Sequence, residues 1–324
     1  MKMYLSYAVA LSAITAGTAS AEVTVFEKDN FSYSVSADLQ IQLLQESGID
    51  EDIDVNFDDG EIKNHFEYKL NDSLVGFGQL DFDVAQDDEV AREEAYIGLA
   101  SGGLSFWVGA SDYVTDAFGV ERSIDVGDVA GDAFLLDNSD DLIGFGYETD
   151  LYTIKLSHDL EVEDDATSTD VFLESGFAGF SVALALQTAS NIVLDTGNGG
   201  TLLTDADTYG ISVAYDLADY GVALAYSSVD IDEAPDTINN LNVTGSAKVL
   251  PTTTVSLGFE TVDVGGDANE ALLGINDSDS WYLNAVYQFP NASNFSTFAE
   301  VGQTDVDGVD DIDAGFLAGL RLVF

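Results

Sequence analysis

Polar and apolar residues alternate one by one along most of this chain. From Phe31 to Leu43 every odd position is apolar and every even position is polar. Successive side chains of a strand point to opposite faces, so this pattern predicts a strand with one apolar and one polar face. The same alternation returns over residues 241–249, 255–260, 281–289 and 316–324.

Sixteen segments of this kind are predicted. They begin near Phe31, Glu61, Ser73, Val90, Leu104, Asp141, Tyr152, Ser168, Ala178, Ala206, Gly221, Asn239, Thr252, Ser278, Asn294 and Asp313. The connections alternate between short turns, such as Asn71-Asp72, and longer acidic or glycine-rich loops over residues 47–60, 191–205 and 264–277. An even number of strands joined in this rhythm is typical of an up-and-down barrel with short periplasmic turns.

The apolar face of these strands is expected to lie against lipid. No stretch after residue 21 offers 18 uninterrupted apolar residues, so spanning helices are not predicted. Lipid cannot satisfy free backbone groups, so a sheet in a membrane must close on itself. Sixteen strands then leave a lumen too wide for side chains to fill, and it holds water.

A soluble β-sandwich is the competing architecture, because it also alternates apolar and polar positions. The even strand count and the alternating loop lengths argue against it. Aromatic residues at strand ends also favour a membrane barrel, where they form girdles at the two interfaces. Examples are Phe31, Tyr33, Trp281, Phe289 and Phe324.

The first 21 residues have the pattern of a secretory signal peptide. A basic start at Lys2 precedes an apolar stretch, and Ala19-Ser20-Ala21 is a small-x-small cleavage site. The alternative is an N-terminal anchor helix. We therefore divide the chain into a signal peptide, residues 1–21, and one barrel domain, residues 22–324.

The composition excludes some functions. Nine Lys+Arg face 60 Asp+Glu, a net charge of −51, and nucleic-acid binding needs a basic face. Cysteine is absent, so disulfides do not close the fold. His65 and His158 are the only histidines, and no nucleophile motif accompanies either. An enzyme is not predicted.

Several short motifs resemble the trimeric general porins of Gram-negative bacteria. Residues 21–28, AEVTVFEK, resemble their mature start, and residues 92–99, REEAYIGL, resemble one of their strands. The connection over residues 113–139 is similar to their long third loop. The final Phe324 resembles the C-terminal signal read by the barrel-assembly machinery.

This resemblance implies an all-β fold: a 16-stranded antiparallel transmembrane β-barrel with an inward-folded third loop, assembled as a homotrimer in the cell outer membrane. It also implies a constriction in which loop acids face a basic wall. Carried over, the loop acids are Asp125, Asp128 and Asp132, the basic wall is Lys28, Lys63 and Arg92, and Asp137 stands where the family usually has arginine.

The expected function is a water-filled channel for passive diffusion of small hydrophilic solutes. Acids across a narrow aqueous constriction favour cations, so a cation preference is predicted. Lipid and lipopolysaccharide are the expected surroundings. No cofactor is expected, although loop carboxylates would hold Ca²⁺ or Mg²⁺ weakly. A substrate-selective porin and an acidic structural or adhesive surface barrel remain open alternatives.

Overall fold

The computed structural model describes residues 22–49, 51–84, 90–124, 126, 134–160, 166–195, 200–273, 275–309 and 312–324. Within these residues the strands are β1 (Val23–Lys28), β2 (Phe31–Gln45), β3 (Asp54–Asp59), β4 (Ile62–Lys69), β5 (Val75–Val84), β6 (Val90–Ser101), β7 (Leu104–Asp112), β8 (Asn138–Glu148), β9 (Tyr152–Asp159), β10 (Thr167–Phe177), β11 (Phe180–Asp195), β12 (Thr201–Leu217), β13 (Tyr220–Ile231), β14 (Ile238–Leu250), β15 (Thr253–Asp263), β16 (Ser278–Phe289), β17 (Ala292–Val306) and β18 (Gly315–Val323). A 3-10 turn, η1 (Val114–Ala117), and one short helix, α1 (Asp267–Leu273), accompany them.

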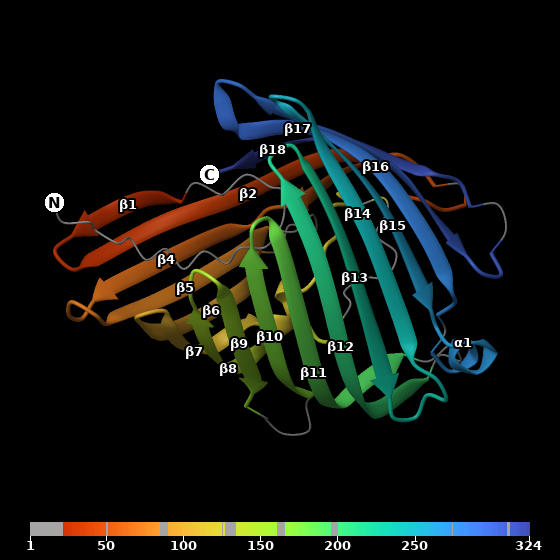
Figure 1. Cartoon of the computed structure of the whole chain (residues 1–324), viewed down its shortest axis with the longest axis horizontal. Helices are drawn as coiled ribbons and strands as arrows, with labels where there is room; N and C mark the ends of the chain where they lie inside the picture. Colours follow the sequence, from red (N-terminus) through yellow and green to blue (C-terminus); the bar gives the residue numbers. More distant parts are fainter. Residues whose placement is uncertain are drawn as a thin grey trace.

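The strands form one closed antiparallel barrel (Figure 1). From β4 onward each strand pairs with its neighbour in sequence, and β18 pairs with β2 from Phe316↔Gln45 to Val323↔Asp38, which closes the ring. β3 and β4 both pair with β2, so they are two parts of one interrupted strand. β1 pairs with the first part of β2 and continues the line of β18. Counting β3 with β4, and β1 with β18, as one strand each, the closed barrel has sixteen strands around its circumference, as predicted.

Burial shows that the barrel is inside out relative to a soluble protein. Large apolar side chains such as Ile97 (69% exposed) and Val222 (59%) lie on the outer face. Polar side chains such as Asp170 (0%) and Gln187 (1%) are buried on the lumen face. This is the distribution expected of strands that face lipid on one side and a polar interior on the other.

The strand register confirms the predicted segments and corrects the predicted loops. β3 lies within residues 47–60, and β11 and β12 extend into residues 191–205, both of which were predicted as loops. α1 lies in the third predicted loop, residues 264–277, and β1 was not predicted as a strand. These strands were missed because their apolar residues are few and stand among acidic residues and glycines: β3, for example, has only Val55 and Phe57 between Asp54, Asn56 and Asp58.

None of the helices in the described ranges is long and apolar enough to span a membrane. The proposed signal peptide, residues 1–21, lies outside the described residues and stays a prediction.

Candidate functional site

The third loop turns into the barrel directly after β7. The Tyr113 hydroxyl donates to Asp159 Oδ2 on β9 at 2.9 Å. The Thr115 hydroxyl donates to Asp170 on β10, and both of these side chains are fully buried. A 3-10 turn that begins here, η1, lets Tyr113 and Thr115, two positions apart, reach two adjacent strands. The root of the loop is thus held against the β9–β10 wall.

The returning limb of the loop is held by one side chain. Gln187 on β11 accepts hydrogen bonds from the backbone N–H groups of Leu135 (3.1 Å) and Leu136 (3.2 Å). Its amide nitrogen donates to the Leu136 carbonyl at 2.7 Å and to Asp170 at 3.1 Å. Since Asp170 also accepts from the loop root, Gln187 and Asp170 join both limbs of the loop in one buried network.

Arg122 carries the loop across to the opposite wall. Its side chain is 8% exposed and reaches Asp216 on β12 (3.5 Å) and the Ser246 hydroxyl on β14. Its backbone N–H donates to the Tyr282 hydroxyl at 2.8 Å, and its carbonyl accepts from Asn284 at 2.6 Å. Arg122 therefore attaches the loop to the barrel wall, because its guanidinium group pairs with the Asp216 carboxylate there.

Glu300 on β17 is the anchor that lies farthest along the sequence from β7, where the loop begins. Its carboxylate accepts hydrogen bonds from the Ser123 hydroxyl (3.0 Å) and from the backbone N–H groups of Ile124 and Val126 (2.8 Å each). Asn284 donates to it at 2.9 Å. Bonds to a charged acceptor are the stronger kind, so this buried acid is a main attachment of the loop.

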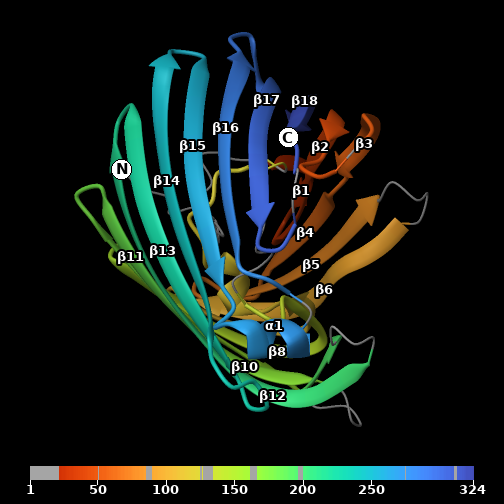
Figure 2. The same cartoon turned by 90° about the vertical axis from the view of Figure 1, so that its right-hand side faces the viewer.

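These contacts place the loop against the wall from β9 round to β17. Val126 also packs with Leu44 on β2 and Leu317 on β18. In Figure 2 the yellow ribbon of the loop lies inside the ring of strands. The lumen that remains is bounded by the loop on one side and by the arc from β3 to β8 on the other.

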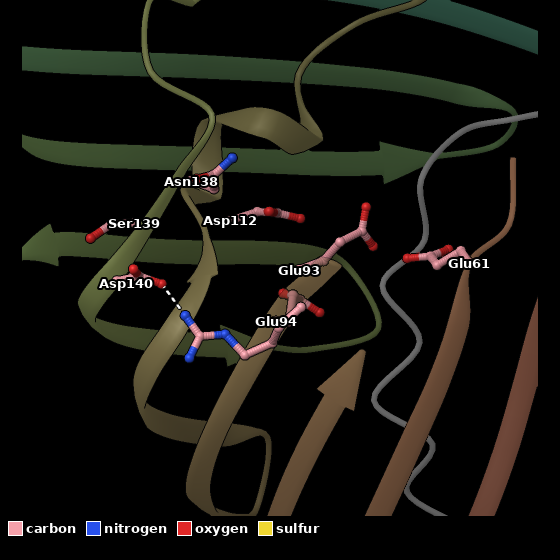
Figure 3. A pocket seen from close by; sticks show the side chains of 8 residues that line it. Glu61, Glu93, Glu94, Asp112, Asn138, Ser139 and Asp140 are labelled. Atoms are coloured by element: carbon pink, nitrogen blue, oxygen red, sulfur yellow. Dashed lines mark hydrogen bonds and ion pairs between the residues drawn. The ribbon is translucent and has the colours of Figure 1, made fainter. Parts of the chain in front are cut away.

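A pocket of about 310 Å³ opens on that arc, where the loop leaves β7 (Figure 3). Its lining residues are mostly acidic: Glu61, Arg92, Glu93, Glu94, Asp112, Asn138, Ser139 and Asp140. Five carboxylates thus surround one guanidinium among the described residues. We call this group the acidic pocket.

Interrupted strand pairing brings these acids together. Between β5 and β6 the register shifts, so that Glu93 and Glu94 both stand opposite Asp81. Between β7 and β8 a second shift places Asp140 and Asp141 opposite one residue. A β-bulge turns two consecutive side chains toward one face and re-aims them. Adjacent acids that regular alternation would separate can therefore gather beside one pocket.

The basic residues around the acidic pocket are each paired. Lys63 forms an ion pair with Glu61, and Arg92 forms one with Asp140. Glu94 instead accepts from neutral donors: the Gln79 amide and, at 3.1 Å, the Ser111 hydroxyl. Three carboxyl groups of the pocket, Glu93, Glu94 and Asp112, therefore remain without a basic partner among these ion pairs.

The sequence-predicted site residues fall in different places. Lys63 and Arg92 lie at or beside the acidic pocket, whereas Lys28 is at the exposed end of β1, opposite Phe31. Asp137 is exposed, accepts a hydrogen bond from the Asn138 side chain (3.2 Å), and its carbonyl accepts from the Tyr113 N–H (2.7 Å).

The predicted loop acids were Asp125, Asp128 and Asp132. All three lie outside the described residues, so their role in a constriction stays a prediction.

The sequence reasoning missed the loop anchors and most of the pocket. Arg122, Glu300, Glu93 and Asp112 were not singled out. For Glu93 a signal existed: the consecutive acids Glu93-Glu94 break the alternation of their segment, and such a break indicates a bulge. No local signal marked Glu300, whose partners in the loop lie more than 170 residues away along the chain.

Comparison with known proteins identifies the family to which the chain belongs. Residues 8–315 match the family of Gram-negative porins. The chain belongs to the Gram-negative porin family. A relative, porin-like protein H of Photobacterium profundum, is 22% identical over 98% of both chains. This porin is thus an outer-membrane channel of a family whose members form pores rather than catalyse reactions.

Solved structures of similar shape share the barrel. A loop-deletion mutant of OmpT from Vibrio cholerae matches 91% of this porin and 100% of its own chain, with a TM-score of 0.75 and 20% identity. The trimer form of OmpT matches with a TM-score of 0.73 and 18% identity over the same shares. An anion-selective porin from Comamonas acidovorans matches with 0.67 and 13% identity, again over 91% and 100%. At these identities the likeness shows the fold alone.

Proposed function

We propose that this porin is a cation-preferring channel for passive diffusion of small hydrophilic solutes. The observation that carries the proposal is the acidic pocket, in which five carboxylates and one guanidinium line the wall that the third loop leaves open. Fixed charge beside a narrow aqueous path raises the local concentration of ions of opposite sign, because the low-dielectric wall focuses the field.

The lumen residues, rather than the barrel, have to set this preference. The same fold occurs in a porin described as anion-selective. In this porin the two cations nearest the pocket, Lys63 and Arg92, are already neutralised by Glu61 and Asp140. Glu93, Glu94 and Asp112 are therefore left to act on passing ions.

The proposed oligomeric state draws on the similar structures. One of the similar structures is described as a trimer. We propose a homotrimer of this porin, embedded in outer-membrane lipid and lipopolysaccharide, with each protomer conducting separately. Weak Ca²⁺ or Mg²⁺ binding by the exposed loop carboxylates is part of the same proposal.

The test is the reversal potential in a planar bilayer under a KCl gradient. Wild type should conduct in steps that come in threes and should reverse at a cation-selective potential. Glu94→Gln with Asp112→Asn should move the reversal potential toward zero. Asp219→Asn, in an exposed periplasmic turn, is the matched control and should leave it unchanged. An anion-selective or unselective wild type would refute the proposal.

The same recording tests the predicted loop acids. Asp128→Asn should weaken the cation preference if that carboxylate lies at the constriction. An unchanged reversal potential would place the selectivity in the acidic pocket alone.

A further inference from the structure

Two aromatic side chains lie along the barrel wall on the arc that the third loop leaves open. Phe77, Gly98, Trp107 and Gly144 are register partners on β5, β6, β7 and β8, four neighbouring strands (Figure 1). A Cβ atom at Gly98 would overlap the Phe77 ring, and one at Gly144 would overlap the Trp107 indole. Each ring therefore covers the glycine of the next strand. We call these two rings and their two glycines the aromatic row.

The aromatic row faces the lumen. Trp107 packs beside a buried cluster that includes Val114 and Phe134 of the third loop, which lies inside the barrel. Register partners on neighbouring strands share one face of a sheet, so Phe77 points the same way. Both aromatic side chains are only partly buried. Each ring therefore has one face against the wall and part of the other face open to the pore.

The same arrangement occurs on the opposite arc, where the third loop covers it. Tyr282 and Phe298 also lie over glycines of the neighbouring strands, and both are almost fully buried. The Tyr282 hydroxyl accepts from the Arg122 backbone N–H, and Phe298 packs with Val126. On that arc the chain itself covers the rings. The rings of the aromatic row instead meet whatever passes through the pore.

Hydrogen-bonding side chains border the aromatic row on both sides. Gln79 and Tyr96 form the next register pair on the extracellular side. Ser105 and Lys155 lie in the next register row on the periplasmic side, one on each flank of β8. Together they offer an amide, two hydroxyls and an ammonium group. A pyranose ring has the matching chemistry, because its C–H groups form an apolar face and its hydroxyls, which both donate and accept, surround the edge.

The aromatic row also runs along the path of a solute. Neighbouring strands lie about 4.8 Å apart, so Phe77 and Trp107, two strands apart, are separated by about 10 Å along the row. Barrel strands tilt by about 35–45°, so a register row runs obliquely down the wall instead of around it. Successive rings of one oligosaccharide can therefore stack on both side chains while the solute advances through the pore.

We propose that the aromatic row is a weak, saturable binding track for neutral oligosaccharides built of pyranose rings. The sugar rings stack on Phe77 and Trp107, and their hydroxyl groups bond to the polar side chains on either side. The aromatic row shares no residue with the lining of the acidic pocket, and stacking requires no charge on the solute. This inference rests on the proposed diffusion channel and names a class of solute that the wall would retain.

The first test measures the reduction of the mean single-channel current by maltotriose in symmetrical KCl. In wild type the reduction should saturate with concentration. In Trp107→Leu the half-saturating concentration should rise about fivefold, because leucine is apolar but presents no flat ring face. Trp107→Phe keeps an aromatic face and should retain most of the affinity. Polyethylene glycol of the same mass has no ring and should give no saturable reduction.

Tryptophan emission provides a second measurement at the site itself. The chain has two tryptophans, and Trp281 lies on the outer face. In Trp281→Phe all tryptophan emission comes from Trp107, and maltotriose should change it with the half-saturating concentration found from the current. In Trp107→Phe, which keeps Trp281 alone, maltotriose should leave the emission unchanged.

Three results would overturn the inference: equal half-saturating concentrations in wild type and Trp107→Leu, an equal effect of polyethylene glycol, or Trp107 emission that maltotriose does not alter. The reversal potential of the same channels separates this failure from that of the proposed function. Cation preference without a saturable sugar effect removes the binding track only, whereas a folded protein that does not conduct removes both. Heat-modifiable mobility on gels checks folding, and Phe77→Leu replaces Trp107→Leu if the latter does not fold.

Discussion

Replacing Glu300 with alanine should release the tip of the third loop from the barrel wall. The carboxylate accepts three hydrogen bonds from the loop, two of them from the backbone N–H groups of Ile124 and Val126. A hydrogen bond to a charged group contributes about 1.5–3 kcal/mol, and bonds that share one acceptor do not add fully. A loss of about 3 kcal/mol is therefore a reasonable expectation for the attachment of the loop.

This loss of attachment free energy should be visible in the single-channel current. Because about 1.4 kcal/mol corresponds to a factor of ten, the ratio of detached to attached loop should rise by about 150-fold. If the loop is held by about 5 kcal/mol in wild type, the detached state grows from about 0.02% to a few per cent of the time. Single-channel traces of Glu300→Ala should then show brief steps to a higher conductance that wild type lacks.

A lumen acid that holds no loop provides the control. Glu174→Ala removes a carboxylate of the same type from β10 and should keep the current quiet. A cysteine introduced beside Ile124, where the chain has none of its own, should also react faster with an aqueous thiol reagent in Glu300→Ala. A folded Glu300→Ala channel with the conductance, noise and labelling rate of wild type would refute the assignment of Glu300 as an anchor.

Two further predictions concern the barrel wall. Gly144→Ala would place a Cβ atom 1.9 Å from the ring of Trp107, so the indole must move. We expect a shifted tryptophan emission and a loss of about 1–3 kcal/mol in urea unfolding. Leu156→Lys puts a charge on the outer face and should cost about 2–4 kcal/mol, whereas Thr153→Lys, which faces Glu174 in the lumen, should cost little. Equal stabilities of the two lysine variants in lipid vesicles would contradict the assignment of the two faces.

The barrel could be predicted from the sequence because its determinant is local. Alternation over a single strand, as in Phe31 to Leu43, is enough to assign two faces, and the lipid requires that the faces be opposite in character. β3 was missed because it is short and its two apolar residues, Val55 and Phe57, stand within an acidic run that was predicted as a loop.

The site could be predicted only in part, because its determinants are not local. The place of Glu93 depends on a register shift against β5, and that of Arg122 depends on Asp216 and Ser246 across the lumen. The resemblance of short motifs singled out Lys63 and Arg92, which lie at or beside the acidic pocket. It gave no sign that Glu61 and Asp140 neutralise them.

The seam of the barrel has a consequence for biogenesis. β18 closes on β2, and the last residue, Phe324, exchanges backbone hydrogen bonds with Ala37 at 2.7 and 3.0 Å. Residues from opposite ends of the sequence must therefore meet before the ring is complete, which makes closure a slow, late event. Until then two strand edges stay open to other chains. We therefore expect the joining of β2 to β18 to limit the folding rate, and we expect any factor that covers these two edges until they meet to suppress aggregation.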